Sequence, residues 1–111
     1  MATIYVRQGD NNVTRTLTCK NADGTYPSLL GATLRFHAGY EGDKASVILD
    51  KAATLSDADT GQVTVTFLSA DTVTAYPSLD AEIQATFTDG TILTFPTKGG
   101  QLKLVIVGEV G

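Results

Sequence analysis

The only histidine, His37, is the residue best suited to catalysis, because an imidazole group exchanges a proton near neutral pH. It lies on the polar side of an alternating segment, and no Ser, Cys or Asp stands at a spacing that predicts a catalytic triad. We therefore interpret His37 as a solvent-facing or interface residue. An active site there would have to recruit Asp or Glu side chains from distant positions, so we predict that the protein is not an enzyme.

A pair of acidic residues, Asp57 and Asp59, is followed by Gly61 and is similar to the opening of a calcium-binding loop. In an EF-hand loop the twelfth position is a bidentate Glu, whereas this chain has Leu68 there. We interpret residues 57–61 as an acidic turn, with calcium binding by Asp57 and Asp59 as the open alternative.

A second pair, Asp80 and Glu82, lies on one face of a predicted strand, and paired carboxylates perform acid and base catalysis in glycoside hydrolysis. No Trp is present to stack on a sugar, so we interpret both as solvated. Gly99-Gly100 is interpreted as a turn, because no phosphate-binding motif surrounds it.

Cys19 is the only cysteine, which excludes an intrachain disulfide and a zinc site built from several thiolates. It shares a predicted strand face with Val13 and Leu17, where a cysteine acts as a small apolar filler. We predict no catalytic, cofactor-binding or metal-binding residue.

The charge balance limits the partners that the chain can bind. Eight Lys and Arg residues stand against twelve Asp and Glu residues, a net charge of -4, and no run of basic residues occurs. Nucleic acids and anionic membranes require a clustered positive surface, so we expect neither. Residues 1–7 lack the pattern of a secretory signal, and no stretch reaches the roughly 20 apolar residues of a membrane span. We expect synthesis and folding in a cytoplasm.

The elements that hold these residues are strands, because apolar and polar residues alternate with a period of two over most of the chain. A single helical turn is predicted at 69–72, and Asp89-Gly90 predicts a two-residue hairpin with a type I′ turn. The spacing indicates an all-β protein, an antiparallel immunoglobulin-like β-sandwich of about seven to nine strands in a single domain, 1–111. Strands are predicted at 2–7, 13–19, 32–38, 62–67, 79–88, 91–95 and 101–107, with one bent strand or two short ones at 45–55.

An ordered set of local sequences runs through the second half of the chain. Asp57-Ala58-Asp59-Thr60-Gly61-Gln62-Val63 precedes a strand, Ala70-Asp71-Thr72 follows it, and Leu79-Asp80-Ala81-Glu82-Ile83 leads into a hairpin at 86–96. In these features the chain resembles phage virion domains typified by the N-terminal domain of the baseplate upper protein. The likeness extends more loosely to Gln8-Gly9-Asp10 and to 23–34. It departs at Ala75-Tyr76-Pro77, where such domains often have Gly-x-Tyr.

The resemblance implies a phage virion structural protein of the tail, baseplate, neck or capsid that connects other virion proteins by protein–protein contacts. It also implies a homo-oligomer, a trimer or ring, within a virion assembled in the host cytoplasm. Baseplate proteins continue into long trimerising or receptor-binding regions, whereas this chain stops at Gly111, so we expect its own surfaces and sheet edges to make the contacts.

Two alternatives stay open. One is a carbohydrate or host-receptor binding module, in which Tyr26, Tyr40 and Tyr76 lie in or beside loops and stack on sugar rings. The other is a capsid cement or decoration protein.

Overall fold

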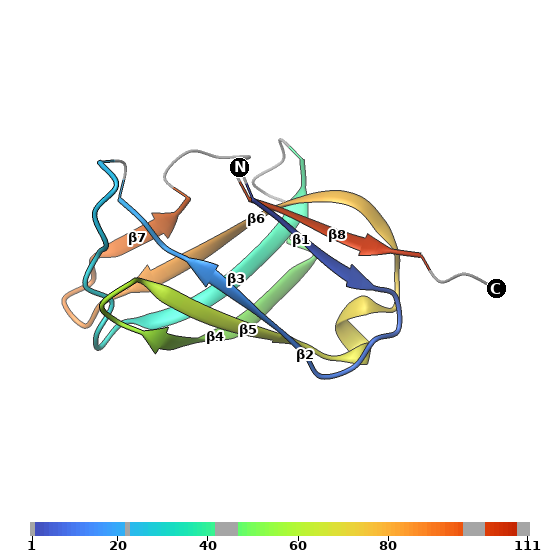
Figure 1. Ribbon diagram of the computed structural model, residues 1–111, viewed down its shortest axis with the longest axis horizontal. Helices are drawn as coiled ribbons and strands as arrows, with labels where there is room; N and C mark the ends of the chain where they lie inside the picture. Colours follow the sequence, from blue (N-terminus) through green and yellow to red (C-terminus); the bar gives the residue numbers. More distant parts are fainter. Residues whose placement is uncertain (1, 22, 42–46, 97–101, 109–111) are drawn as a thin grey trace.

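Alternating side chains produce eight strands in the computed structural model, which describes residues 2–21, 23–41, 47–96 and 102–108 (Figure 1). One 3₁₀ turn, η1, follows β5 and confirms the helical turn predicted at 69–72. The elements are β1 (Ala2–Arg7), β2 (Val13–Thr18), β3 (Thr33–Tyr40), β4 (Leu49–Asp57), β5 (Gln62–Phe67), η1 (Ser69–Thr72), β6 (Tyr76–Thr86), β7 (Ile92–Phe95) and β8 (Leu102–Val107).

The strands pair in the order β1-β8-β6-β3-β4-β5-β2, and β7 pairs with β6 beside this path. Six of the seven pairings are antiparallel. The seventh, between β1 and β8, is parallel, which corrects the expectation of a wholly antiparallel sheet. A parallel pair needs a long connection, and here the whole domain connects the first strand to the last.

Strand β4 pairs with β3 along its first part and with β5 along its second part. Residues 49–53 pair with β3, whereas Thr54, Leu55 and Asp57 pair with β5, with a register shift between Leu55 and Asp57. The chain therefore has one bent strand here, and residues 45–46 of the predicted segment lie outside the described residues. The bend turns the sheet at β4, between the part that contains β3 and the part that contains β5 and β2.

The strands form one mixed, nearly closed sheet, and the core lies on its inward side. Phe36 on β3 and Phe67 on β5 are both fully buried and meet edge to face, with ring centroids 5.6 Å apart. Such aromatic pairs add about 0.5–1.5 kcal/mol beyond the burial of their surface. Cys19 is 1% exposed within the same core, so its predicted role as an apolar filler is confirmed.

Strand β6 begins at Tyr76, three residues before the predicted start at 79. It includes Pro77, which has no backbone donor for a sheet. The register of β6 against β8 shifts between Tyr76 and Leu79, and this irregularity accommodates the proline.

The hairpin that joins β6 to β7 has a three-residue loop, Thr88-Asp89-Gly90, so the predicted type I′ turn at Asp89-Gly90 is wrong. The Phe87 amide donates to the Thr91 carbonyl at 2.8 Å, and the Gly90 amide donates to the Phe87 carbonyl at 3.0 Å. A type I′ turn needs positive φ at both central residues. Of these two, only Gly90 has it, with φ 91°. The turn at Gly99-Gly100 lies outside the described residues.

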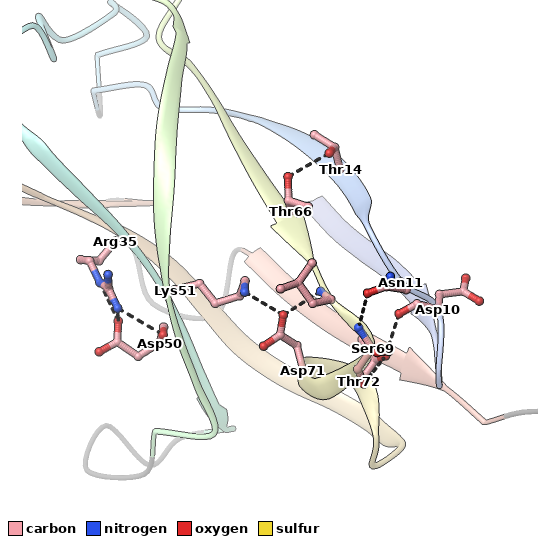
Figure 2. Close-up of polar contacts among 11 residues, drawn as sticks. Asp10, Asn11, Thr14, Arg35, Asp50, Lys51, Thr66, Ser69, Asp71 and Thr72 are labelled. Carbon is pink, nitrogen blue, oxygen red and sulfur yellow. Dashed lines mark hydrogen bonds and ion pairs between the residues drawn. The ribbon is translucent and has the colours of Figure 1, made fainter.

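Thr72, in η1, forms hydrogen bonds with the turn between β1 and β2, at the end of the molecule where these segments meet (Figures 1 and 2). Its side chain is fully buried; Oγ1 accepts the Gly9 amide at 3.1 Å and donates to the Asp10 carbonyl at 3.2 Å. The Ser69 amide donates to Asn11 Oδ1 at 2.9 Å. One short turn thus satisfies polar groups of a segment about sixty residues away.

Replacement of Thr72 by Val should lower the free energy of unfolding by about 1 kcal/mol, because the Gly9 amide and the Asp10 carbonyl lose their hydrogen bonds to Thr72 Oγ1, although the Gly9 amide keeps the Thr72 carbonyl as an acceptor. Urea denaturation followed by circular dichroism measures this loss. The control is Thr74→Val, at an exposed position two residues on, which should change stability by less than about 0.5 kcal/mol. Equal effects of the two variants would contradict the anchoring role of Thr72.

Candidate functional site

A charged strip crosses the outer face of β6, β3 and β4. His37 on β3 stands opposite Glu82 on β6 and opposite Asp50 on β4, and Arg35 lies two residues before it on the same face. These residues point away from the core because Phe36, between Arg35 and His37, points into it. The predicted polar position of His37 is therefore confirmed. We call Arg35, His37, Asp50 and Glu82 the charged strip.

Asp50 is the acceptor at the centre of this strip. Its Oδ1 lies 2.9 Å from Arg35 Nε, 2.8 Å from Arg35 Nη2 and 3.2 Å from His37 Nε2 (Figure 2 shows the Arg35 contact). Arg35 Nη2 also donates to the Asp50 backbone carbonyl at 3.2 Å. The hydrogen bond from Arg35 holds the pKa of the Asp50 carboxyl below its usual value. Asp50 therefore stays a carboxylate in mildly acidic solution and keeps Arg35 and His37 in place.

The groups around His37 show which chemistry the charged strip can support. Its neighbours across the sheet are carboxylates, and within the described residues the single cysteine, Cys19, lies in the core and not on this outer face. Burial raises the pKa of the Cys19 thiol from 9.0 to about 11, so the sulfur is protonated at neutral pH and is a poor nucleophile. The strip thus combines an imidazole with carboxylates and a guanidinium, which suits it to pairing with complementary charges on another surface.

Asp80 and Glu82 share the outer face of β6 as predicted, but each stands beside a different basic residue. Lys103 on β8 places Nζ 2.5 Å from Asp80 Oδ1 and 2.7 Å from Glu41 Oε2. These two hydrogen bonds raise the pKa of Lys103. Glu82 lies opposite His37 instead. The two carboxylates are therefore divided between two groups of charges.

The acidic turn after β4 contains a local hydrogen bond. Asp57 Oδ1 accepts the Asp59 amide at 3.0 Å, and both side chains are exposed. Among residues that the structure describes, no three His, Cys, Asp or Glu side chains gather closely enough to hold a metal ion.

The three tyrosines proposed to bind sugars do not form one group. Tyr40 and Tyr76 meet with ring centroids 6.2 Å apart. Tyr26 lies beside Gly61 in the β4–β5 turn, on the side where β3 starts, whereas Tyr40 is the last residue of β3, so the two tyrosines are far apart along that strand. Lys20 Nζ lies 5.5 Å from the centre of the Tyr26 ring. Only the Tyr40–Tyr76 pair can therefore act as a joint aromatic surface.

The sequence analysis missed an ion pair between Lys51 on β4 and Asp71 on η1. Lys51 Nζ lies 2.7 Å from Asp71 Oδ2, and each side chain is only 17% exposed (Figure 2). The same carboxylate oxygen accepts the Leu68 amide at 2.7 Å. The signal was available, because Lys51 interrupts the apolar positions Leu49, Ala53 and Leu55 on one side of an alternating strand.

The outer face of β2, β5 and the second part of β4 consists mainly of uncharged polar side chains, with Asp57 opposite Gln62 at its border. Across β2, β5 and β4, Thr16 stands opposite Thr64, and Thr64 stands opposite Thr54. Thr14 Oγ1 and Thr66 Oγ1 share a hydrogen bond of 2.9 Å (Figure 2). We call this outer face the hydroxyl face. It is formed by Thr14, Thr16, Thr18, Thr54, Gln62, Thr64 and Thr66.

In comparison with known proteins, no family model matches this chain, and no curated protein is significantly similar to it. Within the described residues, the structure has no helix long and apolar enough to cross a membrane. The case for a function therefore depends on the residues themselves: a charged strip on one outer face and the hydroxyl face on the other.

The depressed pKa of Asp50 gives a prediction for Arg35→Gln. Loss of the guanidinium should raise the pKa of the Asp50 carboxyl toward its ordinary value, which ¹³C NMR titration of the side chain measures. The control is Arg7→Gln on β1, which should leave the Asp50 titration unchanged. If Asp50 titrates identically in wild type and Arg35→Gln, the contact does not control its ionisation.

Burial of Cys19 predicts a loss of stability in alkaline solution. Its folded pKa of about 11 exceeds the ordinary 9.0, so only the unfolded chain ionises between these values and the free energy of unfolding falls as pH rises. A shift of this size corresponds to about 2–3 kcal/mol. Urea denaturation at pH 8 and pH 11 should show a smaller pH-dependent loss in Cys19→Ala than in wild type. Parallel losses would contradict this.

Proposed function

We propose that the chain is a structural protein of a phage virion, of the tail, baseplate, neck or capsid, which joins other virion proteins and copies of itself by protein–protein contacts. The observation that carries the proposal is the ordered set of sequences from Asp57 to Pro96, through which the chain resembles phage virion domains. One of these sequences, Ala70-Asp71-Thr72, has a structural role: Asp71 binds Lys51 on β4, and Thr72 binds the β1–β2 turn. The chain would act within the virion, after assembly in the host cytoplasm.

The proposed fold is an immunoglobulin-like sandwich, and the strand order supports it. In such sandwiches the first, second, fourth and fifth strands form one sheet, and the third, sixth and seventh form the other. The pairing of β1 with β8 departs from this scheme. Here β2, β5 and the second part of β4 pair with one another, while β3, β6, β7 and β8 make the opposite group. In this scheme β7 and β8 together take the place of the seventh strand, because both pair with the same side of β6.

The outer faces support a role in assembly. One carries the charged strip, which suits electrostatic matching with a partner, and the other carries the uncharged hydroxyl face. Hydroxyl groups both donate and accept hydrogen bonds, so a threonine surface adapts to a protein partner without exposing a large apolar patch. A homo-oligomer, as a trimer or ring, belongs to this proposal.

A second candidate is a carbohydrate or host-receptor binding module. The observation that favours it is the Tyr40–Tyr76 pair, because Tyr40 is 52% exposed and offers an aromatic surface at the end of β3. In a glycan array, binding by wild type that Tyr40→Ala abolishes would favour this module. A third candidate, a capsid cement or decoration protein, is a special case of the virion role.

The virion role is tested on particles. Gold-labelled antibodies against the purified chain should mark intact phage particles from the bacterium that carries the gene, and mass spectrometry of those particles should detect the chain. Label on the tail or baseplate supports a connector, whereas label spread over the capsid supports a cement protein. Particles that lack the chain would refute the virion role.

A further inference from the structure

The sheet path leaves free strand edges, and they differ in how well they are protected against pairing with another chain. Strand β7 has only four residues and is followed by Pro96, which cannot continue a ladder. Strand β1 has its Tyr5 carbonyl occupied by Arg15 Nη2 at 3.2 Å. Strand β2 has six residues with no proline, and among the described residues it pairs with β5 alone. The edge of β2 is therefore less protected than that of β7.

The backbone groups on the free side of β2 can be identified from its register with β5. The Cys19 amide donates to the Gly61 carbonyl at 2.8 Å, so positions 19, 17, 15 and 13 exchange hydrogen bonds with β5. The intervening residues, such as Thr14, do not exchange backbone hydrogen bonds with β5, and the close contact of the Thr14 and Thr66 hydroxyls is typical of such pairs. The amides and carbonyls of Thr14, Thr16 and Thr18 therefore face away from β5.

The threonine side chains of this edge do not oppose pairing. Thr14, Thr16 and Thr18 are exposed, uncharged and β-branched, which favours extended structure. Arg15, the one charged residue of β2, lies across this edge, because its Nη2 donates to the Tyr5 carbonyl of β1 and its Nη1 to the Thr14 carbonyl, each at 3.2 Å. Pairing with another strand therefore requires this exposed side chain to turn away from the edge. A carbonyl oxygen has two lone pairs, so the Thr14 carbonyl keeps one position for a further donor.

We propose that two copies of the chain pair through β2, antiparallel, about a two-fold axis at Thr16. In this register Thr16 exchanges backbone hydrogen bonds with the partner's Thr16, and Thr14 exchanges them with the partner's Thr18. Arg15 stands opposite the partner's Leu17, so no like charges meet. The two hydroxyl faces become one continuous face over six strands, in the order β4-β5-β2-β2-β5-β4.

A second copy suits this edge because the edge is complementary to itself. Each threonine amide and carbonyl finds the same pair of groups across the axis, and the threonine side chains form cross-strand pairs without charge repulsion. A two-fold contact closes at two copies, so a trimer or ring requires a further surface. The inference rests on the self-association included in the proposed function, but it is independent of the virion role.

Thr16→Pro tests the edge. Proline removes an amide that faces away from β5, so the β2–β5 pairing and the fold remain, while two intermolecular hydrogen bonds across the axis are lost. By sedimentation equilibrium, wild type should dimerise, and Thr16→Pro should raise the dimer dissociation constant about tenfold or more. The matched control, Thr16→Val, keeps the amide and the branched side chain and should dimerise like wild type. A monomeric wild type would overturn the inference. Association of Thr16→Pro as strong as that of wild type would also overturn it, although self-association through another surface would then remain.

A cross-linking experiment does not depend on how well the proline variant folds. Directly paired strands bring their α-carbons to about 5.5 Å, within the range of a disulfide. Thr16→Cys should therefore form a disulfide-linked dimer under mild oxidation, whereas the buried Cys19 of wild type should not. Thr64→Cys, on the same face but on β5, would lie about 14 Å from its copy at the known strand spacing and should stay monomeric. Efficient linkage through Thr64→Cys and not Thr16→Cys would indicate stacking of the hydroxyl faces and overturn pairing at the edge.

Discussion

The contact between Phe36 and Phe67 is the interaction on which the rest of the structure depends. It joins β3 to β5, two strands on either side of β4, within the core. Both rings point inward from strands, and in a strand every second side chain lies on the same face. The remaining residues of each strand are then left to the outer faces, and the surface chemistry of the protein follows from this division.

The two outer faces differ in composition because their side chains do not pack in the core and need not be apolar. Around His37 the face carries charges of both signs, with Asp50 bound to Arg35. The face around Thr16 and Thr64 consists of hydroxyl and amide groups. Both faces are built on rigid strands, so a partner meets a surface that is already ordered, and the entropy cost of binding is reduced. This arrangement suits a protein that works by contact.

Local sequence patterns predicted the local structure well. Alternation located the strands, the Ser69–Thr72 segment forms the expected turn, and Cys19 fills the core. Alternation does not specify which strand lies beside which, and the parallel pairing of β1 with β8 was accordingly missed. The Asp89-Gly90 pair fits two kinds of hairpin loop, and the number of loop residues depends on the register between β6 and β7.

The candidate site was predictable only in part, for the same reason. The outward position of His37 follows from its strand, but its contact with Asp50 depends on the register between β3 and β4. The Lys51–Asp71 pair and the link from Arg15 to the Tyr5 carbonyl join elements whose proximity the sequence does not state. Interactions between distant segments depend on the strand order and on how the sheet closes around the core, which no local sequence pattern specifies.

The central claim is that the outer edge of β2 is a surface for association. Amide hydrogen exchange by NMR at low and high protein concentration tests it most directly, since it observes the backbone groups themselves. The account predicts that the Thr16 and Thr18 amides exchange fast in dilute solution and slowly in concentrated solution, while the Leu17 amide is protected in both. Thr16 and Thr18 amides that exchange at the same rate at both concentrations would contradict it.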